Sequence, residues 1–242
     1  MGIHAGTTLD RELRATPTNQ QALVLVPPLA APAPRRTSAA WPRAKRVADV
    51  LLAVVLLVAV LPLLLVIGLA IRLDTPGPLF FRQQRLGRDR RTFTVLKFRT
   101  MHDGVSPEAH RLYIAKLAAE GEAGEGLKKL TADPRVTRVG AFLRRTSLDE
   151  LPQLINIVRG EMSVIGPRPA LEYELEHYDP GDYARFDVRP GLTGLWQVSG
   201  RNSIGFRGML ELDAQYARTT SARLDATILL RTPLALLRGN AA

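Results

Sequence analysis

An uncharged apolar run at residues 50–71 constrains this chain more than any other feature. Val, Leu, Ile and Ala fill nearly all of its 22 positions. As an α-helix the run would extend about 33 Å, enough to cross a bilayer. A signal peptide would start nearer the N-terminus and be followed by a small-residue cleavage pattern. A buried soluble helix would need a far larger protein around it. We therefore expect a membrane helix over residues 47–73.

The flanks of this run leave its topology open between a spanning helix and a re-entrant helix. Arginines and lysines lie on both sides of the run, which conflicts with a single span under the positive-inside rule. Pro62 lies near the middle, where it removes a backbone hydrogen bond and bends the helix. Proline kinks also occur in spanning helices, so charge and kink alone favour the two topologies about equally.

Composition narrows the function of the remaining chain. Residues 1–46 mix Thr, Pro, Ala and Arg without a period and are predicted to be a disordered tail; residues 74–242 have the size of one catalytic domain. The net charge of +10 leaves nucleic acid, an anionic membrane or a phosphorylated substrate as targets. The absence of cysteine excludes disulfides, thiolate metal sites and cysteine nucleophiles. No P-loop and no G-x-G-x-x-G occurs.

Local patterns predict an α+β fold that is mainly helical, with a small catalytic domain beside the membrane helix. Two short strands are expected at 79–81 and 92–98, with a hairpin around Gly87. The last segment, 224–237, carries Leu and Ile broken by arginines and is expected to be an interfacial amphipathic helix. Further helices are predicted at 106–120, 139–145, 148–159, 170–177 and 207–217.

The stretch RRTSLDELPQL at residues 144–154 is the strongest candidate for chemistry. Ser147 and Glu150 fit a capping box, with Asp149 in the same first helical turn, and this structural interpretation is the commoner one for such a pattern. Alternatively, two adjacent carboxylates beside Arg144 and its neighbour can hold a divalent cation and a phosphate, as phosphoryl transfer requires.

Two further stretches combine arginine with residues that shape the backbone. In GPRP at residues 166–169, the prolines would present Arg168 with little entropy left to lose; a rigid turn with Arg168 paired to a nearby Glu is an equal alternative. In RPGLTGLWQVSGR at residues 189–201, three glycines allow close approach to a ligand and two arginines suit phosphate. Trp196 can stack on a base, although a core position is commoner.

From about residue 45 to its C-terminus the chain resembles the monotopic polyprenyl-phosphate phosphoglycosyl transferases, the bacterial sugar transferase family. Several motifs in the right order carry the resemblance: GPLFF at 77–81, KFRTM at 97–101, DPR at 133–135, SLDELPQ at 147–153, GPRP at 166–169 and PGLTG at 190–194. The tail lies outside it, and the multi-span N-terminal domain of longer members is missing.

The resemblance implies a covalent two-step reaction. Asp149 stands at the nucleophile position and would form a phosphosugar intermediate from a nucleotide diphosphate sugar, expected to be a UDP-sugar. Glu150 matches the ligand of a Mg²⁺ cofactor. Arg144 and Arg168 match phosphate-contacting positions, and Arg201 is a weaker match. Pro62 matches the helix-breaking proline of a re-entrant helix, although Leu61 replaces the usual preceding Ser.

The implied partners are a polyprenyl phosphate, a nucleotide sugar and the membrane, and nucleic acid becomes the least expected partner. The implied location is the bacterial inner membrane, with the catalytic domain on the cytoplasmic face, where the reaction would initiate surface polysaccharide synthesis. The sequence leaves the oligomeric state open, a homodimer included. The alternative function is a membrane-tethered basic protein that binds nucleic acid or anionic lipid without catalysis.

Overall fold

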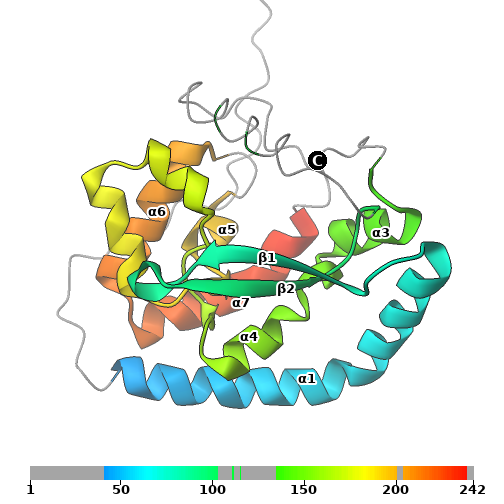
Figure 1. Cartoon of the computed structure of the whole chain (residues 1–242). Helices are drawn as coiled ribbons and strands as arrows, with labels where there is room; N and C mark the ends of the chain where they lie inside the picture. The colour runs from blue at the N-terminus through cyan, green and yellow to red at the C-terminus, as the bar shows by residue number, and fades with distance from the viewer. Residues whose placement is uncertain (1–40, 103–110, 112–114, 116–134, 201–203, 239–242) are drawn as a thin grey trace, which may run out of the picture.

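The computed structural model describes residues 41–102, 111, 115, 135–200 and 204–238. Its first element is helix α1 (Trp41–Asp74), which contains Pro62 and bends between an N-terminal and a C-terminal arm (Figure 1). The helix begins six residues earlier than the predicted start at residue 47, so residues 41–46 of the predicted tail are helical. The rest of that tail, and most of the helix expected at 106–120, lie outside the described residues.

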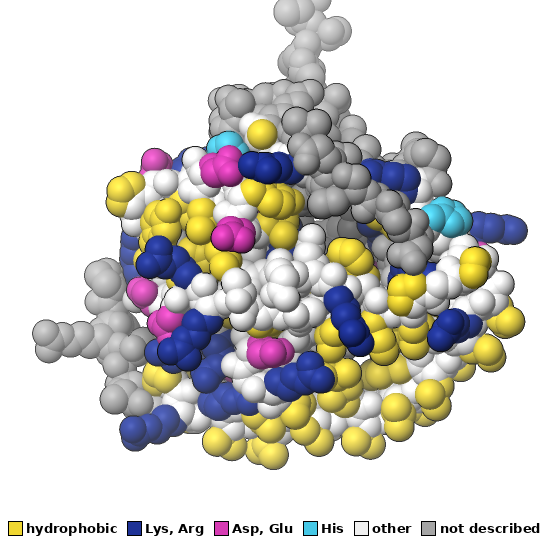
Figure 2. Space-filling view, viewed as in Figure 1, with side chains coloured by type: hydrophobic (Ala, Val, Ile, Leu, Met, Phe, Trp, Pro, Cys, Tyr) yellow, Lys and Arg dark blue, Asp and Glu magenta, His cyan; other side chains and the backbone are white. Residues whose placement is uncertain are grey.

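Most of the apolar surface of α1 is exposed. The helix is long and apolar enough to cross a membrane, and only 11% of its most apolar 18-residue window is buried. In Figure 2 hydrophobic side chains form a band along the edge of the molecule that α1 occupies in Figure 1. Burying such a surface in lipid would remove it from water, so α1 fits a membrane-anchoring helix.

The two arms of α1 pack against the same folded unit. Ala53 of the N-terminal arm belongs to a core cluster with Leu154 and Ile157, while Ile67 and Ile71 of the C-terminal arm pack with Phe98 and Leu143. Hydrogen bonds also attach residues near both ends of α1 to this unit. Arg46 donates to the Ile157 carbonyl at 2.6 Å, and the Val139 amide donates to Asp74 at 3.1 Å.

The predicted hairpin is present as strands β1 (Phe80–Leu86) and β2 (Thr92–Phe98), which pair antiparallel around a short 3₁₀ turn, η1 (Arg88–Arg90). Opposite residues of an antiparallel pair project to the same face. One face therefore carries Phe81, Gln83 and Arg85 of β1 together with Phe93, Val95 and Lys97 of β2.

The prediction of a single helix at 148–159 is wrong. A 3₁₀ turn occupies the first three of these residues, and an α-helix begins only at Gln153. Helix α3 (Arg138–Thr146) ends at Ser147 in the left-handed conformation, followed by the 3₁₀ turn η3 (Leu148–Glu150) and then helix α4 (Gln153–Arg159). Within the described chain Ser147 makes no side-chain capping bond, so the expected capping box does not form either.

The remaining elements complete the folded unit, and two of them contact the N-terminal arm of α1 through Ser163–Asp49 and Lys45–Asp225. Strands β3 (Ser163–Ile165) and β4 (Gly191–Thr193) form a short parallel pair that the sequence did not predict. The helix expected at 170–177 is a 3₁₀ helix. The predictions at 207–217 and 224–237 are confirmed as helices. The elements are η4 (Glu172–His177), η5 (Pro180–Asp187), α5 (Leu195–Ser199), α6 (Phe206–Thr219) and α7 (Ala222–Arg238).

Candidate active site

Asp149 and Glu150 lie side by side in η3, on a turn closed by backbone hydrogen bonds. The Glu150 amide donates to the Ser147 carbonyl at 3.2 Å, and the Leu151 amide donates to the Leu148 carbonyl at 3.3 Å. Ser147 has φ 58°, which L-residues rarely adopt outside such turns. Both carboxylates are partly exposed. The chain therefore presents two adjacent carboxylates to the surface on a short, fixed support.

Cationic side chains from two other elements reach this turn. Lys97 of β2 donates to Glu150 Oε1 at 2.7 Å, with both side chains about one-third exposed. Arg144 Nε, one turn before the end of α3, donates to Thr100 Oγ1 at 3.0 Å. The turn, the end of β2 and the end of α3 thus lie together, with Lys97 bonded to Glu150 and Arg144 bonded to Thr100 just after β2.

Gly140 sets how closely α3 approaches the end of β2. A Cβ atom at this position would lie 2.2 Å from the Thr100 carbonyl oxygen, which no real contact allows. The Thr137 amide donates to the same carbonyl at 3.1 Å, and the Thr137 hydroxyl caps α3 by accepting from the Gly140 amide. This close approach places Arg144 beside Thr100.

Arg168 lies on the GPRP loop, where the structure pairs it with an acid. Its Nη1 donates to Glu174 Oε1 at 3.0 Å; Glu174 is fully buried, whereas the Arg168 side chain is 26% exposed. Burial alone would raise the pKa of Glu174, but Arg168 and its neighbouring arginines lower it. The structure thus shows the alternative in which Arg168 lies on a rigid turn and pairs with a nearby Glu. The Arg168 guanidinium nevertheless stays partly accessible to a ligand.

A second, buried ion pair forms hydrogen bonds to the backbone of the GPRP loop. Arg185 of η5 donates to Asp213 of α6 at 2.6 Å, and both side chains are sealed, 1% and 0% exposed. Arg185 also donates to the Arg168 carbonyl at 2.8 Å and to the Tyr178 hydroxyl, while Asp213 accepts from the Arg168 amide at 3.3 Å. Burial raises the pKa of Asp213 to about 6 in spite of Arg185. The pair therefore fixes the backbone of Arg168 through bonds to its amide and its carbonyl.

Sequence reasoning missed two cations in the site. Lys97 was part of a recognised motif but was not assigned a role; its position opposite Phe81 in the hairpin brings it to the carboxylate turn. Arg85 follows the apolar run, and no motif in the sequence assigns it a role. Burial and the neighbouring Arg168 lower the pKa of Arg85, and Glu150 is among the charges that act on it.

The glycine-rich stretch at 189–201 has a structural role in its described part. A Cβ on Gly191 or Gly194 would lie 2.1 Å from backbone atoms of Gly166, so these glycines permit the β3–β4 approach and not the approach of a ligand. The Thr193 hydroxyl lies 2.9 Å from that of Thr232, and Trp196 is a core residue with 9% exposure. Arg201 lies outside the described residues.

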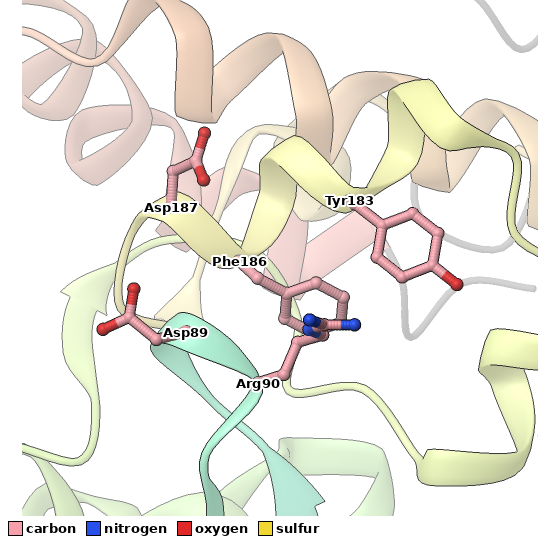
Figure 3. A pocket seen from close by; sticks show the side chains of 5 residues that line it. All are labelled: Asp89, Arg90, Tyr183, Phe186 and Asp187. Carbon is pink, nitrogen blue, oxygen red and sulfur yellow. The ribbon is translucent and has the colours of Figure 1, made fainter.

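A separate cavity of about 510 Å³ lies between η1 and η5. Figure 3 shows Asp89 and Arg90 facing Tyr183, Phe186 and Asp187 across it, with the Arg90 guanidinium 5.8 Å from the Tyr183 ring centre. None of the expected site residues lines this cavity. Across the part of the chain that the structure describes, no group of three or more His, Asp or Glu is placed to hold a metal.

Comparison with known proteins gives a consistent picture. The family model described as bacterial sugar transferase matches residues 40–239. The exopolysaccharide production protein ExoY of Rhizobium meliloti is 44% identical over 82% of this chain and 89% of its own length. The UDP-glucose:undecaprenyl-phosphate glucose-1-phosphate transferase of Caulobacter vibrioides is 42% identical over 80% and 69%, respectively. The undecaprenyl-phosphate galactose phosphotransferase of Salmonella typhimurium is 38% identical over 82% and 41%.

Proposed function

The chain belongs to the bacterial sugar transferase family and is a phosphoglycosyl transferase, and from this premise we propose its reaction. It transfers a sugar 1-phosphate from a nucleotide diphosphate sugar, a UDP-sugar in the first instance, to a membrane polyprenyl phosphate. The product is a polyprenyl diphosphate sugar, which initiates a surface polysaccharide. Membership of this family favours catalysis over the alternative of a non-catalytic basic binding protein.

Asp149 is the proposed nucleophile. One of its carboxylate oxygens attacks the sugar-side phosphorus; the bond from that phosphorus to the bridging oxygen breaks, and the electron pair leaves with the nucleoside monophosphate. The lipid phosphate oxygen then attacks the same phosphorus and releases the Asp149 carboxylate. The observation that supports this assignment is the partly exposed Asp149–Glu150 turn, which presents two adjacent carboxylates at the surface.

Mg²⁺ suits this site by the chemistry of its donors. Mg²⁺ is commonly bound by one or two carboxylates together with substrate phosphates and water, and the turn offers two carboxylates side by side. Glu150 would hold it, with Asp149 adjacent. When bound, the ion neutralises charge on the diphosphate. Lys97, Arg144 and Arg168 supply further positive charge for the phosphates, and we assign Arg201 the same role.

A re-entrant course of α1 is the topology that we propose. Both arms pack on one folded unit, and side chains near both helix ends, Arg46 and Asp74, bond to its backbone. A spanning helix would carry one of these polar contacts into or across the bilayer, where unpaired backbone groups are costly. The exposed leucines of α7, Leu230 and Leu237 among them, would rest in the same interface. Both ends of α1 then face the cytoplasm.

The absence of cysteine makes this topology testable. Single cysteines at the exposed positions Ala44 and Gln84 flank the apolar part of α1. We expect a membrane-impermeant thiol reagent to label neither in intact spheroplasts and both after lysis. Labelling of one position alone in intact spheroplasts would show that α1 spans the inner membrane.

The reaction is tested with the purified full chain, Mg²⁺, polyprenyl phosphate and a panel of nucleotide diphosphate sugars. The parent is expected to release nucleoside monophosphate from at least one donor. Asp149→Asn removes the nucleophile without changing its size and should slow release by more than about 1,000-fold, as losses of covalent nucleophiles do. Release by Asp149→Asn at the parent's rate would contradict the assignment. The exposed Asp187→Asn, on η5, is the matched control.

A further inference from the structure

Arg85 lies directly beside the loop that carries Arg168. The Leu86 amide donates to the Ala170 carbonyl at 2.8 Å, so the end of β1 and the end of the GPRP loop run side by side. Arg85 Nη1 donates to the Pro169 carbonyl at 3.0 Å. Two guanidinium groups from distant parts of the sequence thus meet at one place.

The guanidinium of Arg85 is held in a fixed orientation. Its Nε and Nη2 donate to Gln83 Oε1 at 2.9 and 2.6 Å, and these bonds together with the one to Pro169 engage three of the five N–H donors of an arginine. The acceptors are neutral, and one N–H on each terminal nitrogen is left. The residue is partly exposed, so a ligand can reach it.

Positive charge exceeds negative charge around this pair. Among the described residues, Arg85 and Arg168 both act on a buried carboxylate, Glu174, and lower its pKa. Arg185 is matched by Asp213 at 2.6 Å and does not change the balance. A cation that is removed from water without a full counter-charge costs free energy, and an anionic ligand would recover it through charge-assisted hydrogen bonds.

The position of Arg85 relates it to the carboxylate turn. Arg85 and Lys97 project to the same face of the hairpin, and Lys97 pairs with Glu150. Residue 85 lies four residues along β1 from residue 81, the partner of Lys97, which is about 14 Å at 3.4 Å per residue. Glu150 is among the charges that act on Arg85, so the two places lie within reach of one extended ligand such as a diphosphate and its substituents.

We propose that Arg85, together with Arg168, binds the nucleoside-side phosphate of the donor. This inference rests on the proposed function. As the bond between the bridging oxygen and the sugar-side phosphorus breaks, the electron pair moves to the nucleoside monophosphate. The guanidinium pair neutralises this growing charge, which stabilises the leaving group. Gln83 is then a positioning residue that orients Arg85.

The test compares binding of the nucleoside monophosphate that the parent releases with binding of the same nucleoside without phosphate. Arg85→Gln should weaken binding of the monophosphate by about 10- to 100-fold and leave the nucleoside unchanged, because only the monophosphate carries the charge. Arg82→Gln, an exposed arginine on the opposite face of β1, is the matched control and should change neither. A purely structural role of Arg85 would weaken both ligands equally.

Two results would overturn the inference while the proposed function stands. One is an active parent whose folded Arg85→Gln variant binds the monophosphate as the parent does. The other is a raised KM for polyprenyl phosphate with an unchanged KM for the donor, which would place the lipid phosphate at Arg85. If Arg85→Gln does not fold, Arg85→Lys is measured, with at least a threefold loss expected for the monophosphate alone and parent-like affinity contradicting the inference. A parent that releases no monophosphate contradicts the proposed function itself.

Discussion

Two ion pairs of nearly equal length differ in solvent exposure and therefore in their role. Lys97 and Glu150 meet at 2.7 Å and are 28% and 35% exposed, whereas Arg185 and Asp213 meet at 2.6 Å and are sealed. Water competes for the first pair, so a phosphate or a metal ion can separate it at little cost. The second pair has no such competitor, and its loss leaves a buried charge. Distance alone therefore does not identify a functional pair; solvent access does.

The largest effect should come from breaking the sealed pair. Asp213→Ala leaves the Arg185 guanidinium buried without its counter-charge and removes the acceptor of the Arg168 amide. We expect the free energy of unfolding to fall by about 3–5 kcal/mol. Thermal unfolding of the detergent-solubilised chain would show this as a lower midpoint.

A double variant sharpens this result. Replacing both partners, Arg185→Met with Asp213→Leu, removes both charges and should cost clearly less than Asp213→Ala alone. If the double variant is as unstable as the single one, the sealed pair stabilises through shape and not through charge.

The difference between local and long-range contacts explains which features the sequence could predict. The adjacent carboxylates, the GPRP turn and the hairpin depend on neighbours within a few residues, so local patterns identified them. Arg185 and Asp213 are separated by 28 positions, and β3 and β4 are three residues each. No local period marks such contacts, because the tertiary fold brings them together. The helix expected at 148–159 failed because residues 148–150 form a separate 3₁₀ turn and α4 begins only at Gln153, after Pro152.

A smaller effect is expected from pH. The folded chain raises the pKa of Asp213 from 3.8 to about 6, so between these values the folded state binds a proton that the unfolded state has lost. A proton on Oδ1 leaves Oδ2 accepting from Arg185 and from the Arg168 amide, unlike the alanine variant, so the contribution of this proton to stability is full below about pH 4 and is lost as pH rises through 6. Relative to Asp213→Asn, the parent should gain about 1 kcal/mol between pH 7 and pH 5. Parallel stability curves for the two chains would contradict the raised pKa.

The smallest effect on stability should come from the open pair. Lys97→Met should change the free energy of unfolding by less than about 1 kcal/mol, because exposed pairs contribute little. Turnover should nevertheless fall more than about tenfold, since Lys97 supplies charge beside the carboxylate turn. A large loss of stability in this variant would mean that the pair belongs to the scaffold and not to the site.

The most direct test of the account is a search for the covalent intermediate. The full chain is incubated with Mg²⁺ and an active donor, without polyprenyl phosphate, then quenched in acid and measured by intact-mass and peptide mass spectrometry. The covalent mechanism predicts an added mass of one sugar phosphate on the peptide that contains Asp149, lost when polyprenyl phosphate is supplied and not formed by Asp149→Asn. An active enzyme that forms a ternary complex with both substrates and never carries the adduct would contradict the central claim.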